Sequence, residues 1–171
     1  MILGMTTATF TLIHVLISLL AIGSGLIVLL GMIGAKRLDG WTAFFLLTTL
    51  LTSVTGFLFP IKQVTPGLVV GTISLIVLAV AIVARYTFHL SGVWRATYVI
   101  TAALALYLNT FVLVVQSFEK VGALKALAPT QKEPPFLVTQ LVVMAIFIVL
   151  SVLAVKKFRL ESPRIQIARA A

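Results

Sequence analysis

Long uncharged runs, separated by short charged segments, are the strongest pattern along the chain. Each run is at least 22 residues long, and the runs cover residues 1–35, 40–61, 63–84, 96–118 and 134–155. A helix needs about 20 apolar residues to cross the hydrocarbon layer of a bilayer. The pattern therefore predicts five transmembrane helices in a single membrane domain of residues 1–171. Their expected bounds are about 9–34, 41–59, 68–90, 93–117 and 136–155.

The segments between the runs predict how the helices connect and pack. Ser91-Gly92 leaves room only for a tight turn, so the third and fourth helices should form an antiparallel hairpin. Ala21 and Gly25, four residues apart, form a small-residue pair that lets another helix approach closely. Between the fourth and fifth helices, apolar residues recur every third position, which predicts an interfacial amphipathic helix over about 117–128. The functional alternative for that segment is a lid over an external pocket or a docking surface for a partner.

Composition agrees with a membrane protein and excludes several chemistries. Hydrophobic residues make up 61% of the chain and charged residues 10%, whereas a soluble domain carries about 25% charged residues. The expected fold class is therefore an all-α, polytopic five-helix bundle. The chain has no cysteine, which removes disulfides, thiol redox chemistry and cysteine-ligated metals.

The distribution of the net charge of +9 predicts the orientation of the bundle. With successive loops placed on alternate sides, four basic residues fall on one side and nine on the other. The nine are Lys36, Arg37, Arg85, Arg95, Lys156, Lys157, Arg159, Arg164 and Arg169. The positive-inside rule puts these nine in the cytoplasm, so the N-terminus is expected outside and the basic tail 156–171 inside. The expected partners are membrane lipids, with anionic head groups on the cytoplasmic side, and not nucleic acid.

Uncharged polar side chains from all five helices gather in the outer half of the predicted bundle. Asn109 and Gln116, seven residues apart, project from nearly the same face of the fourth helix. The candidate outer polar pocket consists of His14, Thr52, Thr55, Asn109, Gln116 and Gln140. Joining the helices by hydrogen bonds is the simpler role for such groups, and lining a ligand pocket is the functional one. In both roles Asn109 should face the bundle interior.

The two histidines and four acids limit the possible cofactors. His14 is expected near the outer surface and His89 near the inner one, so they cannot ligate one haem iron together. A haem b held by His14 jointly with another chain stays as an alternative, but we predict no cofactor and no metal. None of the four acids lies in a predicted transmembrane helix, and no catalytic motif is present. Active transport by this chain alone is not expected, because no charged side chain lies at mid-depth.

A second candidate cluster lies at the inner surface. Asp39 is the only acid in the loops expected there between helices, and it could pair with Arg85 or Arg95. Such a pair would fix the first inner loop against the hairpin of the third and fourth helices. A lipid-phosphate site made by the arginines, with His89 beside them, is the functional alternative. The aromatic residues expected at this interface are Trp41, Tyr86, Phe88, Trp94 and Tyr98.

Two stretches, "WRATYVITAALALYLNTFVLVVQSFEK" and "LAPTQKEPPF", resemble a family of small, uncharacterised bacterial inner-membrane proteins. The resemblance covers about a third of the chain. It implies location in a bacterial plasma membrane, and it implies no activity and no functional residues.

Taken together, these patterns predict a multi-pass inner-membrane protein without catalysis. The expected function is that of a binding or accessory protein that engages a lipid, a quinone-like molecule or a membrane partner through its outer polar half. A haem- or quinone-associated redox subunit using His14 is the alternative, and a component of a small-solute transporter comes third. A second copy of the chain is a possible partner.

Overall fold

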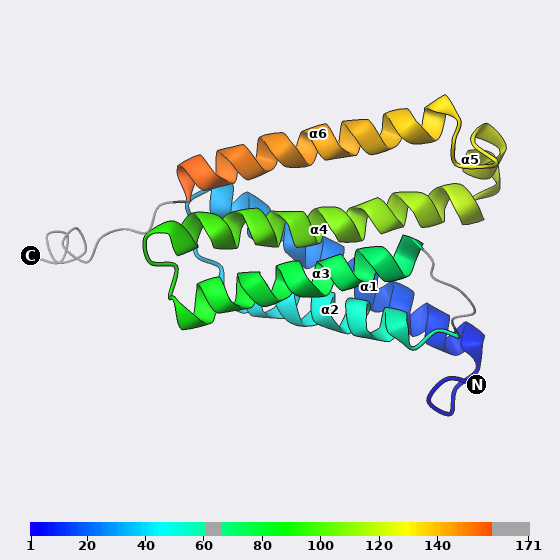
Figure 1. Ribbon diagram of the computed structural model, residues 1–171, viewed down its shortest axis with the longest axis horizontal. Coiled ribbons are helices and arrows are strands. Elements are labelled where there is room, and N and C mark those ends of the chain that lie inside the picture. The colour runs from blue at the N-terminus through cyan, green and yellow to red at the C-terminus, as the bar shows by residue number, and fades with distance from the viewer. Residues whose placement is uncertain (61–65, 159–171) are drawn as a thin grey trace, which may run out of the picture.

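The computed structural model describes residues 1–60 and 66–158, and this part of the chain is an all-helical bundle (Figure 1). Its elements are α1 (Thr7–Ile33), α2 (Asp39–Phe57), α3 (Pro66–Ile82), η1 (Val83–Thr87), α4 (Val93–Lys120), α5 (Gly122–Leu127) and α6 (Pro134–Lys157). Five helices are long and apolar enough to cross a membrane, with η1 continuing α3. The predicted fold class is confirmed, and the structure is compatible with a multi-pass membrane protein.

The helices pack mainly against their neighbours in the chain, and α6 closes the bundle. Short connections make α1 and α2, α2 and α3, α3 and α4, and α4 and α6 antiparallel pairs (Figure 1). Beyond these pairs, α1 contacts both α4 and α6. Because α1 and α4 each touch several other helices, they form the centre of the bundle.

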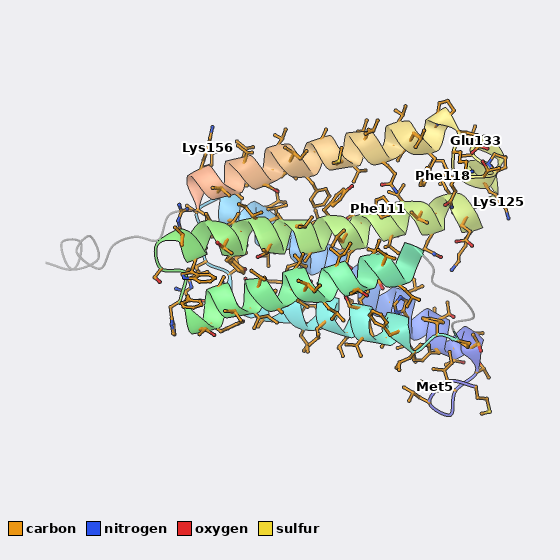
Figure 2. All side chains as sticks on the ribbon, in the orientation of Figure 1. Met5, Phe111, Phe118, Lys125, Glu133 and Lys156 are labelled. Carbon is orange, nitrogen blue, oxygen red and sulfur yellow. The ribbon has the colours of Figure 1, made fainter. Side chains whose placement is uncertain are left out.

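The two ends of the bundle differ in charge. One end holds residues 34–38, residues 88–92 and Phe158, and we call it the basic end. Its described basic residues are Lys36, Arg37, Arg85, Arg95, Lys156 and Lys157. The opposite end holds the N-terminus, α5, Glu133 and the described residues Lys120, Lys125 and Lys132 (Figure 2).

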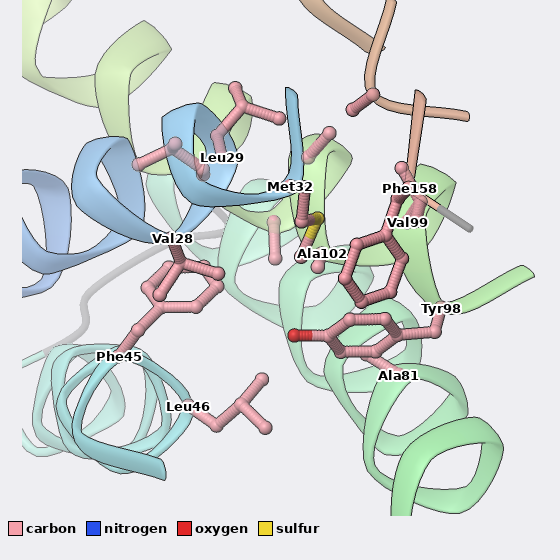
Figure 3. Packing of buried hydrophobic residues seen from close by; sticks show 14 of the residues in the cluster. Val28, Leu29, Met32, Phe45, Leu46, Ala81, Tyr98, Val99, Ala102 and Phe158 are labelled. Atoms are coloured by element: carbon pink, nitrogen blue, oxygen red, sulfur yellow. The ribbon is translucent and has the colours of Figure 1, made fainter. Parts of the chain in front are cut away.

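The hydrophobic core lies in the half of the bundle nearer the basic end. Its members come from the last turns of α1, the start of α2, the end of α3, the first half of α4 and the second half of α6. Val28, Phe45 and Tyr98 turn inward toward one another there (Figure 3). The opposite half has a smaller apolar cluster of Phe118, Ala128 and Phe136.

The predicted small-residue pair lies at a close contact between helices. Ala21 is fully buried, and Gly25 faces α2 and α4. A Cβ atom on Gly25 would come within 2.6 Å of a Leu106 methyl carbon and 2.7 Å of the Phe45 ring. Only hydrogen fits at this position, so Gly25 allows α1 to contact two helices at once.

Two segments differ in detail from the sequence-based prediction. The third helix does not remain α-helical to residue 90, because residues 83–87 form a π-helix. The expected interfacial helix over 117–128 is also divided: α4 continues to Lys120, and α5 begins at Gly122. Phe118 therefore packs against Phe136 as part of α4, with ring centroids 5.4 Å apart, whereas Leu127 of α5 is exposed.

Candidate functional site

Four of the six polar residues expected in the outer half, His14, Thr55, Asn109 and Gln140, bond to neighbouring helices. His14 Nδ1 lies 2.8 Å from Thr55 Oγ1, which itself donates to the Leu51 carbonyl at 2.6 Å. When the Thr55 proton is used in this way, His14 donates through Nδ1. Its Nε2 atom is then the acceptor of a neutral imidazole. This contact joins α1 to α2.

The two deeper amides also make contacts between helices. Asn109 Nδ2 donates to Thr49 Oγ1 of α2 at 3.4 Å, so this side chain faces the bundle interior. Gln140 Nε2 donates to the Phe111 carbonyl of α4 at 3.2 Å. Gln140 Oε1 is buried and has no hydrogen-bond partner among the described residues, and the same is true of Thr52 Oγ1.

The hydrogen bonds of this outer group therefore form separate links and not one connected network. His14 bonds to Thr55, Asn109 to Thr49 and Gln140 to Phe111, and Gln116 makes no hydrogen bond with a described residue. These geometries fit the role of joining helices. The shared outer pocket stays a prediction.

A pocket at the basic end brings together most of the predicted inner cluster. Its volume is about 380 Å³, and it lies between the start of α2 and the end of η1. The lining residues are Arg37, Asp39, Gly40, Ala43, Arg85, Tyr86 and His89. Three of the four residues predicted for the inner cluster therefore line one pocket.

Arg85 is the buried charge of this pocket. It lies in the π-helix η1, and only 3% of its side chain is exposed. The guanidinium carbon lies 5.2 Å from the ring centre of Tyr98 and 5.7 Å from that of Tyr86. Aromatic faces stabilise a cation at such distances, and this helps to offset its desolvation. A π-helix is often found at functional sites.

Asp39 connects Arg85 to a second arginine. Its Oδ1 atom accepts hydrogen bonds from Arg85 Nη2 and from Arg37 Nε, the latter at 2.9 Å. Of the two partners predicted for Asp39, Arg85 and Arg95, the structure shows Arg85. The exposed fractions of the three side chains differ greatly: 63% for Asp39 and 47% for Arg37, but 3% for Arg85. A largely exposed carboxylate therefore faces a buried guanidinium.

Arg85 retains unused hydrogen-bonding capacity. A guanidinium carries five N–H donors, and among the described residues Arg85 hydrogen-bonds only to Asp39. The buried Tyr98 hydroxyl lies near Arg85 and Thr42 but makes no hydrogen bond of normal geometry with a described residue. With two arginines and one aspartate, the pocket carries a formal charge of +1 when His89 is neutral.

The turn that contributes His89 to the pocket has an unusual backbone. His89 and Leu90 have φ values of +48° and +59°, in the left-handed region that non-glycine residues seldom adopt. The rings of Phe88 and Trp94 stack across this turn with centroids 3.9 Å apart. Such backbone strain is found mainly where surrounding contacts hold it, often next to a binding site.

Arg95 has a different role from the one predicted. Its Nη1 donates to the carbonyls of Val155, at 3.0 Å, and Phe158. It therefore caps the carboxyl end of α6, where free carbonyls attract a cation. Arg37 and Tyr86 were missing from the predicted cluster, although each lies within two residues of Asp39 or Arg85 in the sequence.

Among the described residues, no group of three or more His, Asp or Glu side chains is placed to hold a metal ion. No protein-family model, curated protein or solved structure matches the chain. The family resemblance of the α4 region therefore stays a prediction.

Proposed function

We propose that this protein is a non-catalytic membrane binding protein whose ligand is an amphiphile with its polar head in the basic-end pocket. The observation that carries the proposal is Arg85, a buried guanidinium that lines the pocket and uses few of its donors. Asp39 pairs with this cation, and the guanidinium donors that Asp39 does not use are open to an acceptor that enters the pocket. The outer polar pocket is not needed for this function.

The position of the pocket in the bundle supports an amphiphilic ligand. Five apolar helices have exposed apolar side chains along their length, and the pocket lies at one end of them. Tyr86, Phe88 and Trp94 at this end are residue types that prefer the membrane–water interface. A head group in the pocket would leave its acyl chains beside the helices. By the positive-inside rule the basic end faces the cytoplasm of a bacterial inner membrane.

The proposal can be tested by filling the pocket without changing its charge. Ala43 and Ala145 are both exposed alanines on transmembrane helices, and only Ala43 lines the pocket. Each is replaced by Leu, the protein is purified in a mild detergent, and co-purifying small molecules are identified by mass spectrometry. We expect a molecule in the wild type and in Ala145→Leu that is depleted in Ala43→Leu. Equal retention by both variants would exclude this pocket as the binding site.

The geometry of His14 supports a second candidate function, association with a haem or a quinone. Its Nδ1 donates to Thr55, which orients the ring and leaves Nε2 as an acceptor. Metal-ligating histidines commonly have their second nitrogen fixed in this way. His14 also packs edge-on against Phe59, with centroids 5.3 Å apart. A Soret band in the visible spectrum of the purified protein, lost in His14→Ala, would favour haem; a quinone in the lipid extract would favour the quinone alternative.

A further inference from the structure

We infer that the basic-end pocket recognises a phosphate-type oxyanion, and that Asp39 is an internal competitor for the same place. This inference rests on the proposed function, because it names the chemistry of the ligand and the residue that controls its affinity. Asp39 is thus a specificity-determining residue and more than a structural ion pair.

The first support is the convergence of two guanidinium groups on one oxygen atom. Arg85 Nη2 and Arg37 Nε both donate to Asp39 Oδ1, and their residues belong to different parts of the fold, η1 and the α1–α2 connection. Two arginines that share one acceptor define an oxyanion position. The carboxylate oxygen of Asp39 occupies the place that a phosphate oxygen of a ligand would take.

The second support is the contrast in burial across this contact. Arg85 is held in the bundle by its helix and by two aromatic rings, with 3% of its side chain exposed. Asp39 begins α2 with 63% of its side chain exposed, so it can turn into water at little cost. A ligand that displaces Asp39 therefore leaves no buried charge unpaired, because the ligand itself replaces the carboxylate beside Arg85.

The charge of the pocket and its free guanidinium donors select the class of ligand. With Asp39 turned into water, the formal charge beside the ligand is the +2 of Arg37 and Arg85, which suits a phosphate-type oxyanion. Arginine forks bind phosphate oxygens in a bidentate manner, and Arg85 has donors left for a second oxygen. The phosphate could come from a phospholipid head group or from free inorganic phosphate, and both offer the same oxygens to the arginines.

The test compares Asp39→Asn with Lys156→Gln. Both variants change one charge at the basic end, but Lys156 does not line the pocket. Binding is measured for the wild type and both variants in nanodiscs of zwitterionic lipid, titrated with an anionic phosphodiester lipid. Because an ion pair of this exposure is worth up to about 1 kcal/mol, we expect Asp39→Asn to bind about fivefold more tightly. Lys156→Gln should bind as the wild type does.

Unchanged or weaker binding by folded Asp39→Asn would overturn the role of Asp39. If Asp39→Asn does not fold, Asp39→Ser takes its place, because serine also suits the start of a helix. Titration with inorganic phosphate in the same nanodiscs distinguishes the two sources: tightening with phosphate alone identifies a free anion, and tightening only with the lipid identifies a head group. If neither source binds but a co-purified molecule is lost in Ala43→Leu, the phosphate assignment fails while the proposed function stands.

Discussion

A polar side chain between apolar helices must find a hydrogen-bond partner there, because bulk water does not reach it. His14 and Asn109 meet this demand with a group on a neighbouring helix, and Gln140 meets it through its amide nitrogen alone. Arg85 differs from them, because it is a full charge whose hydrogen bond to protein goes to a largely exposed carboxylate. Its cost of burial is therefore offset partly by the pairing with Asp39 and partly by the rings of Tyr86 and Tyr98.

At the residue scale, the two arginines that share Asp39 should contribute very differently to stability. Arg85→Gln should lower the free energy of unfolding by about 1–3 kcal/mol, because it removes a largely buried, charge-assisted hydrogen bond and a cation–π contact. Arg37→Gln should cost about 1 kcal/mol or less, because its side chain is 47% exposed. Thermal unfolding in detergent measures both. Equal losses would mean that the burial of Arg85 has no energetic consequence.

How much of the candidate site could be predicted depends on residue type. A lone acid between basic residues suggests a pair, so Asp39 and Arg85 could be selected from the sequence. The separate roles of Arg85 and Arg95 could not be predicted, because they depend on how far α6 extends toward the basic end. Asn109 was correctly expected to face the interior, but its partner Thr49 depends on the rotation of α2 about its axis.

At the scale of the helices, apolar length predicted the five spans well, since a helix that crosses a bilayer needs a fixed number of residues. Helix ends were less predictable, because local contacts determine them. The π-helix η1 holds the buried Arg85, and the break between α4 and α5 occurs at Val121, whose backbone is extended. Neither feature has a periodic signature.

The close contact at Gly25 allows a matched test of helix packing. Gly25→Val should lower the free energy of unfolding by about 1–3 kcal/mol more than Gly23→Val, because the new side chain would overlap with Leu106 and Phe45. A Cβ on Gly23 would meet nothing within 4 Å, so this variant controls for the loss of glycine and the gain of a β-branched residue. Similar thermal stability of the two variants would contradict the packing of α1 shown here.

The connection before α6 should respond to acid through Glu133. Its carboxylate accepts hydrogen bonds from the Thr130 hydroxyl at 2.8 Å and from the Lys132 N–H at 3.0 Å. Desolvation acts to raise the pKa of Glu133, but these hydrogen bonds and one from the Thr130 N–H outweigh it and lower the pKa. A lowered pKa means that the carboxylate stabilises this turn above the ordinary carboxyl pKa, and that the effect is lost as the pH falls through the folded value.

Amide chemical shifts of Thr130 and Lys132 can report this titration. In the wild type both shifts should change together at a pH below the ordinary range of a glutamate, and in Glu133→Gln the change should disappear. A transition that persists in the glutamine variant would assign it to another group.

At the scale of the whole molecule, the unequal charge of the two ends predicts the orientation of the bundle. A periplasmic reporter fused after Ala128 should be active, and one fused after Arg169 should be inactive, because the basic end is expected to stay in the cytoplasm. The opposite pattern would place the candidate pocket outside the cell and the α4–α6 connection inside.

The central claim is that Arg85 holds an amphiphile in the basic-end pocket, and native mass spectrometry of the protein released from mild detergent tests it most directly. Arg85→Lys keeps the charge but loses the planar fork that binds two oxygens, whereas Lys156→Gln removes a charge outside the pocket. We predict one retained molecule per chain in the wild type and in Lys156→Gln, and none in Arg85→Lys. A wild type that is released without a bound molecule, or an Arg85→Lys variant that retains it, would contradict the account.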